Sequence, residues 1–207
     1  MNVAAVLGTI RIGPGRAAAV AILVLSAAWG GAAQAQSAPD PPGGSLIDEV
    51  RVGVLDHDAR FAGGREPGAD IDAELLFASP VPTSWGETMP DWLAWVAKPR
   101  PHLGGDLNTA GATSQVHAGL TWTIPIVSRL TLDLNAGGSV NNGHVNPTVP
   151  DRKALGSNVL FRLAAELGWH FTPRLAVYAL FEHVSNAGIA RFNESLNDVG
   201  LRFGFRF

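Results

Sequence analysis

His183 and Ser185 stand two residues apart near the end of the chain and have the side chains of a general base and a nucleophile. The odd-numbered positions before them, from Leu175 to Phe181, are apolar, as on one face of a β-strand. Residues two apart on a strand point to the same side, with Cα atoms separated by roughly 6.5–7 Å. An imidazole can lean across that distance to a hydroxyl, so the pair predicts serine-type nucleophilic catalysis.

Asn197 is predicted to join this pair from the next alternating segment. In that segment the odd-numbered residues from Leu201 to Phe207 are apolar, which puts Asn197 on the apolar face as well. If the two segments form a hairpin, His183, Ser185 and Asn197 meet at one level on one surface. An amide oxygen there can accept the imidazole N–H and hold the ring in place.

The elements that position these residues are predicted to be strands. Phe161–Phe171 is the clearest case, because its odd positions are apolar and most of its even positions are polar or small. About eight such segments follow one another, roughly Ser45–Asp56, Ile71–Ala78, Trp92–Asn108, Val116–Ile124, Arg129–Ala136, Phe161–Phe171, Arg174–Asn186 and Asn197–Phe207.

Two all-β architectures fit this pattern, a soluble sandwich or small barrel with an apolar interior and an outer-membrane barrel with a polar one. Segments of nine to eleven residues match the length of a tilted transmembrane strand. Small and charged residues share the polar faces, and Phe207 ends the last alternating segment. We therefore expect an eight-stranded antiparallel transmembrane β-barrel.

The first residues are predicted to be a signal peptide. Arg11 and Arg16 precede a short apolar run, and Ala33-Gln34-Ala35 resembles a cleavage site. The alternative, a transmembrane anchor, needs a longer apolar run. We expect a signal peptide at 1–35, a polar lead at 36–44, a barrel domain at 45–207 and, after export, a place in the bacterial outer membrane.

Composition excludes several other classes of protein. The chain has no cysteine and a net charge of −3, with no clustered basic stripe, so disulfides, thiolate metal sites and a nucleic-acid partner are not expected. No G-x-S-x-G motif is present, which excludes an α/β-hydrolase. His117 and His170 have polar-face parity and are predicted to line the lumen. The histidines lack metal-ligand spacing, so we expect no metal and no cofactor.

The stretch EHVSNAGIARFN (Glu182–Asn193), followed by an alternating aromatic strand, resembles the lipid A 3-O-deacylase (PagL-type) family. The resemblance covers roughly Phe181–Gly200. It implies an outer-membrane barrel whose exterior Ser–His–acid triad removes the 3-linked acyl chain from lipid A, the lipid part of lipopolysaccharide.

The resemblance also implies roles for single residues. Ser185 matches the nucleophile and His183 the general base. Asn193 matches an asparagine that the family needs for activity, which we interpret as an oxyanion donor. Asn186 and Gly188 follow the serine, and a backbone N–H there could be a second donor.

The chain departs from the family at the triad acid, which falls on Asn197. An amide can orient the histidine but cannot stabilise an imidazolium by charge. Asp198 has the right chemistry but the opposite parity, and Glu194 lies in the turn and could fold back. These three alternatives remain open, with Asn197 favoured over Asp198.

Other readings also remain open. A non-enzymatic barrel or a catalytically lapsed relative is the rival function, and a soluble periplasmic lipid-binding barrel is a further one. Lys98 and Arg100 lie in a Pro/Gly-rich run that either bends the third strand or contacts substrate phosphate. Whether the chain is a monomer or a homodimer is left open.

Overall fold

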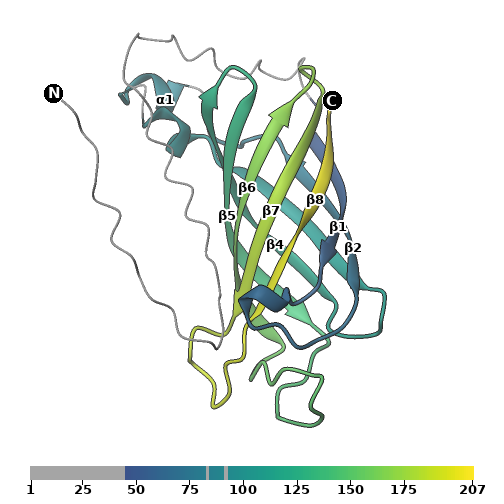
Figure 1. The fold of residues 1–207 in the computed structure, drawn as a ribbon. Helices are drawn as coiled ribbons and strands as arrows, with labels where there is room; N and C mark the ends of the chain where they lie inside the picture. Colours follow the sequence, from purple (N-terminus) through teal and green to yellow (C-terminus); the bar gives the residue numbers. More distant parts are fainter. Residues whose placement is uncertain (1–44, 83, 91–92) are drawn as a thin grey trace, which may run out of the picture. The chain divides into compact units, whose positions relative to one another are not determined.

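The computed structural model describes residues 45–82, 84–90 and 93–207, and in this part of the chain eight antiparallel strands close into a barrel (Figure 1). Each strand pairs with its neighbours in sequence, and the first pairs with the last. The strands are β1 (Ile47–Asp56), β2 (Ala69–Phe77), β3 (Arg100–Asn108), β4 (Gln115–Val127), β5 (Leu130–Asn141), β6 (Val159–His170), β7 (Leu175–Ser185) and β8 (Leu196–Arg206). The predicted signal peptide and polar lead lie outside the described residues.

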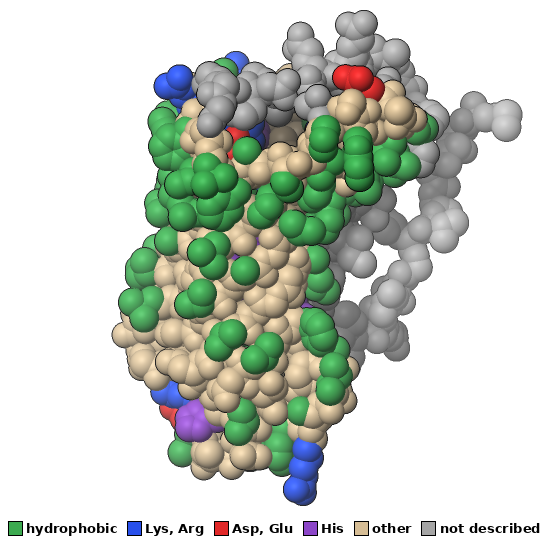
Figure 2. All heavy atoms as spheres, turned by 180° about the vertical axis from the view of Figure 1, so that it is seen from behind, with side chains coloured by type: hydrophobic (Ala, Val, Ile, Leu, Met, Phe, Trp, Pro, Cys, Tyr) green, Lys and Arg blue, Asp and Glu red, His purple; other side chains and the backbone are tan. Residues whose placement is uncertain are grey.

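The predicted fold class is confirmed. Alternation places one row of each strand outside, where side chains such as Val54, Leu163 and Phe203 are more than half exposed. Figure 2 shows apolar side chains over the barrel wall, with the charged groups on this face near its two ends. No helix among the described residues is long and apolar enough to span a bilayer.

The barrel interior is filled by charged side chains that pair with one another. Arg51, Arg162 and Arg202 are fully buried, and each forms an ion pair with a carboxylate from another strand. The Arg51 guanidinium also lies 3.8 Å from the centroid of the Tyr178 ring. Such pairing is required because an unpaired buried charge is costly. In β6–β8 the odd-numbered residues therefore face the membrane and the even-numbered residues face this interior.

The third segment differs from its prediction, because β3 begins only at Arg100. Before it lie α1 (Ser84–Glu87) and the 3₁₀ helix η2 (Ala94–Ala97). The carbonyl of Pro90 accepts the N–H groups of both Leu93 and Ala94, so the chain coils here.

The fifth segment continues five residues beyond its predicted end at Ala136. Gly137 and Gly138, which resemble turn residues, lie inside β5. Gly137 pairs with Gly119 of β4 at a close approach: a Cβ on Gly137 would lie 2.7 Å from the Gly119 Cα. The glycines thus serve strand packing rather than a turn.

The connections give the barrel its orientation. The β4–β5 and β6–β7 turns are short, and they lie at the end where β8 finishes, together with the longer β2–β3 connection that contains α1 and η2 (Figure 1). Longer loops follow β1, β5 and β7 at the opposite end. In outer-membrane barrels the short turns face the periplasm and the long loops face outward. His183 and Ser185, at the end of β7, therefore lie at the outer end.

Candidate active site

The last hairpin brings the three predicted residues together. In the β7–β8 register His183 is directly opposite Asn197, and Ser185 is two residues further along β7. His183 and Ser185 are partly exposed on the outer face, whereas Asn197 is buried, with 8% of its surface exposed. The period-two geometry of β7 makes His183 and Ser185 neighbours, and the hairpin register adds Asn197.

The three side chains form a continuous hydrogen-bonded chain. His183 Nδ1 lies 2.7 Å from Asn197 Oδ1, and His183 Nε2 lies 3.1 Å from Ser185 Oγ. Since an amide oxygen only accepts, Nδ1 carries the proton and Nε2 is left as the acceptor for the serine hydroxyl. This is the tautomer that a general base needs, at a distance suited to proton transfer.

A tight turn follows the serine and is built around Asn186. Its Oδ1 accepts the Gly188 N–H at 3.0 Å, and its Nδ2 donates to the carbonyls of Leu155 and Phe192, both at 2.6 Å. Ala187 has a φ of 55°, an unfavourable conformation for a residue with a Cβ. Such strain persists only where the surroundings enforce it, and here it adjoins the candidate nucleophile.

The hydrogen bonds of this turn change the roles expected of Asn186 and Gly188 as oxyanion donors. The Asn186 backbone N–H, expected as an oxyanion donor, donates to Asn193 Oδ1 at 3.0 Å. The Gly188 N–H is likewise used within the turn. Asn193 is exposed, and its Nδ2 donates to no other residue among those described. Asn193 is therefore the supporting residue whose side-chain donor remains free, and its Oδ1 is bound to the residue that follows Ser185.

Neither alternative acid is available to His183. Asp198 points into the barrel, is 1% exposed, and accepts the Asp58 backbone N–H at 2.6 Å through Oδ1. No bulge reverses its parity, because the β7–β8 register is regular from Leu175 to Leu196. Glu194 is used between loops, where it pairs with Arg65 at 2.6 Å. The alternatives to Asn197 are thus wrong on geometry.

The β1–β2 loop supports the site through contacts with the start of β8. The sequence analysis did not predict these contacts. The Ala59 N–H donates to the Asn197 carbonyl at 2.7 Å, one residue from the Asp58–Asp198 contact. Lys153 of the β5–β6 loop then joins Asp58 Oδ1 to the Ser195 carbonyl, at 2.5 and 2.6 Å. Asn197 is therefore fixed on its backbone by one loop and on its side chain by His183. No periodic pattern marks such loop residues.

A buried histidine closes the same loop. His57 contacts Asp70 at 2.8 Å and Glu66 at 3.3 Å. Burial alone would lower the pKa of His57, but these hydrogen bonds and the charge of Asp198 raise it to about 10. Burial would raise the pKa of Glu66, but the hydrogen bonds of His57 and of loop N–H groups lower it to about 2. The loop is therefore held by charged partners at neutral pH.

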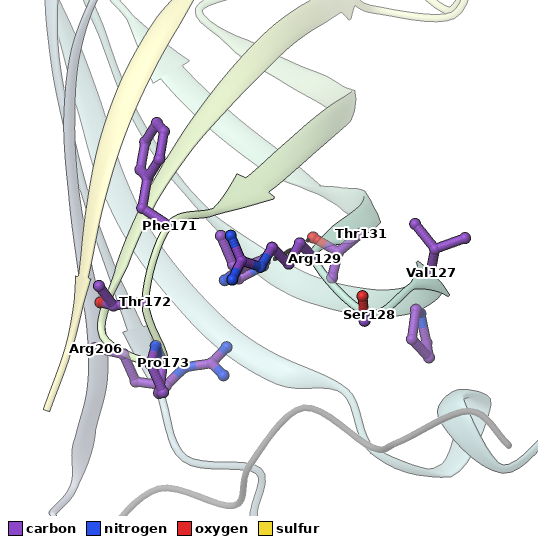
Figure 3. Close-up of a pocket in the computed structure, with 10 residues that line it drawn as sticks. Val127, Ser128, Arg129, Thr131, Phe171, Thr172, Pro173 and Arg206 are labelled. Atoms are coloured by element: carbon purple, nitrogen blue, oxygen red, sulfur yellow. Dashed lines mark hydrogen bonds between the residues drawn. The ribbon is translucent and has the colours of Figure 1, made fainter.

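An open cavity of about 480 Å³ adjoins Asn193 on the outer loops. Arg65 and Arg152 line it, together with Phe192. Another cavity of about 210 Å³ lies at the opposite end of the barrel, where Arg129 and Arg206 extend towards the space between the turns (Figure 3).

The alternative that Lys98 and Arg100 contact substrate phosphate is wrong, because these residues lie far from Ser185. Both residues lie at the periplasmic end of β3, a strand length away from Ser185. Arg100 is buried there and pairs with Asp48 at 2.6 Å and Glu49 at 2.8 Å. Arg100 is part of the ion-pair network that fills the lumen.

Comparison with known proteins identifies the family of this chain. The sequence profile of the lipid A 3-O-deacylase (PagL) family matches residues 81–206. The chain belongs to this family. No curated protein sequence matches it significantly.

Solved structures show the same fold for this deacylase-family protein. The crystal structure of the outer membrane enzyme PagL is similar with a TM-score of 0.52 and 14% identity, covering 77% of this chain and 99% of that one. The crystal structure of neisserial surface protein A has a TM-score of 0.50 and 10% identity, covering 80% of this chain and 100% of that one. This PagL-family member is thus a bacterial outer-membrane β-barrel.

Proposed function

We propose that this protein is a serine hydrolase that removes the 3-O-linked acyl chain from lipid A in the outer leaflet. The observation that carries the proposal is the hydrogen-bonded chain Asn197–His183–Ser185 on the outer face of the barrel. Polar side chains facing lipid are costly unless they are used, and these three lie at the level expected for lipopolysaccharide. Family membership supports the reaction type.

The reaction begins at Ser185. Its Oγ attacks the ester carbonyl while His183 Nε2 takes the hydroxyl proton, and a tetrahedral oxyanion forms. Asn193 Nδ2 donates a hydrogen bond to the oxyanion, with its Oδ1 fixed by the Asn186 N–H. Collapse breaks the bond to the sugar 3-oxygen, which leaves with the proton from His183. Water then hydrolyses the acyl-serine by the same steps, releasing the fatty acid.

The acyl chain would lie on the neighbouring strand. In the β6–β7 register Phe161 is opposite Ser185 and Leu163 is opposite His183, and their side chains are 54% and 57% exposed. An apolar wall beside the nucleophile suits a hydrocarbon chain. The cavity beside Asn193, with Arg65 and Arg152, suits the phosphorylated sugar part of the substrate.

The amide at Asn197 favours a second candidate, a catalytically lapsed relative that persists as a non-enzymatic barrel. Replacing the aspartate of a serine triad with asparagine lowers turnover on the order of 10⁴-fold. In this case the hydrogen bonds would remain, but the protein would not deacylate lipid A.

Mass spectra of lipid A from cells with and without the protein separate the two. The proposal expects the loss of one 3-hydroxyacyl chain with wild type, and no loss with Ser185→Ala. Ser128→Ala, in the short turn at the opposite end, is the matched control and should act like wild type. Identical lipid A in wild-type and Ser185→Ala cells would refute the hydrolase in favour of the lapsed relative.

A further inference from the structure

His117 lies inside the barrel with both ring nitrogens unpaired. It is 1% exposed, and neither Nδ1 nor Nε2 has a hydrogen-bond partner among the described residues. The ring lies over Gly104, its partner in the β3–β4 register, where a Cβ would come within 2.6 Å of Cε1 and 2.9 Å of Nε2. A buried imidazole with two unpaired nitrogens is costly, so a partner is expected.

Carboxylates face both nitrogens, but at distances too long for a hydrogen bond. Asp106 Oδ2 lies 3.9 Å from Nε2, and Glu74 Oε2 lies 3.8 Å from Nδ1. Asp72 is directly opposite Asp106 in the β2–β3 register. One donor atom from each of Asp72, Asp106 and His117 lies within 4.8 Å of the other two.

The charges around Asp106 do not balance. Asp106 Oδ2 accepts a hydrogen bond from the neutral amide of Gln115, at 2.9 Å, and no arginine or lysine of the described chain forms an ion pair with Asp106. Asp72 Oδ1 is unpaired as well, although Arg202 holds Oδ2 at 2.7 Å. Arg162 is taken by Glu182 through Nε and Nη2. The two facing buried carboxylates of Asp72 and Asp106 are thus paired with only one positive charge, that of Arg202. A proton or a cation must neutralise the remaining negative charge.

We propose that Asp72, Asp106 and His117 Nε2 bind one divalent first-row transition-metal ion in the lumen, with Zn²⁺ as the probe. Two ligands about 2.1 Å from one ion are separated by roughly 3–4 Å, which fits the 3.9 Å between Asp106 and His117 after small side-chain rotations. A double positive charge neutralises the two carboxylates. Glu74 then accepts the Nδ1–H, as carboxylates do behind metal-bound histidines.

His102 is not one of the ligands, although its ring lies 5.7 Å from that of His117. Its Nδ1 contacts Thr121 Oγ1 at 2.9 Å, and Arg162 Nη1 lies 3.4 Å from its Nε2. Both nitrogens are therefore engaged, whereas those of His117 are free. The ion joins β2, β3 and β4 inside the barrel, so it stabilises the wall and takes no part in hydrolysis on the outer face.

Metal content of the purified barrel tests the proposal without reference to activity. Protein refolded in detergent with a chelator, then incubated with Zn²⁺ and desalted, should retain one zinc per chain and unfold at a higher temperature than the metal-free form. His117→Gln and Asp106→Asn should lose the zinc and the thermal shift. His170→Gln, at the lumen histidine near the periplasmic end, should keep both.

Wild type that retains no zinc, or His117→Gln that retains as much as wild type, overturns the site. If neither variant folds, X-ray absorption of zinc-loaded wild type decides. One imidazole and two carboxylate ligands at about 2.0–2.1 Å support the site. A shell with any other set of protein ligands places the ion elsewhere and overturns the site.

Discussion

Replacing Asn197 with aspartate should raise the rate of deacylation. Aspartate has the size of asparagine, so its carboxylate can take the position of Oδ1, 2.7 Å from His183 Nδ1. The hydrogen bond that orients the ring is kept, and a negative charge is added beside the imidazolium that forms when Ser185 loses its proton. The change thus isolates charge from orientation.

The size of the gain follows from the distance and the burial. An imidazolium and a carboxylate with charge centres about 4 Å apart attract by about 4 kcal/mol at an effective dielectric constant of ~20, and by about 1 kcal/mol in water. Asn197 is 8% exposed and His183 is partly exposed, so the value lies between these limits. Because about 1.4 kcal/mol is tenfold in rate, kcat should rise from about fivefold to about a thousandfold.

Purified protein acting on lipid A in detergent micelles, followed by mass spectrometry, gives kcat. Asn146→Asp, on an exposed residue of the β5–β6 loop, adds the same charge away from His183 and should leave kcat unchanged. Asn197→Glu should gain less, because it adds a bond of about 1.5 Å to a side chain already within hydrogen-bond distance. An unchanged or lower kcat in folded Asn197→Asp would refute the role of Asn197.

Three substitutions in the outer loops test how these loops support the site. Asn193→Ala should lower kcat about 10²–10³-fold with little change in KM, through loss of the oxyanion donor; an equal rise in KM would instead mean lost substrate binding. Gly156→Ala should reduce deacylation while the heat-dependent gel shift of a folded barrel persists, because a Cβ there would lie 1.9 Å from the Phe192 carbonyl oxygen and Gly156 has a φ of 76°; full activity would show that the turn can relax. The pKa of His57 is raised to about 10, so the stability that its protonated form contributes is complete below about pH 6.5 and is lost as the pH rises towards 10. The thermal midpoint of unfolding should therefore fall over this pH range, and it should fall less in His57→Gln.

The sequence by itself determined which residues share a face. Strand side chains alternate with a period of two, a local property of the backbone, so the barrel class and the common face of His183, Ser185 and Asn197 could be read from the chain. The pairing of β7 with β8 was predictable as well, since consecutive strands of such a barrel pair with each other, and His183 is in fact opposite Asn197. The start of β3 was misplaced because the coiling near Pro90 leaves no periodic signal.

Only the closed barrel decided what the remaining polar groups do. Asp198 is held by a backbone N–H 140 positions away in sequence, and Glu194 by a guanidinium 129 positions away. The lumen cluster of Asp72, Asp106 and His117 draws on three strands with no ligand spacing between them. Such contacts depend on closure between the first and last strands and on loops without a repeat, so no local pattern can encode them.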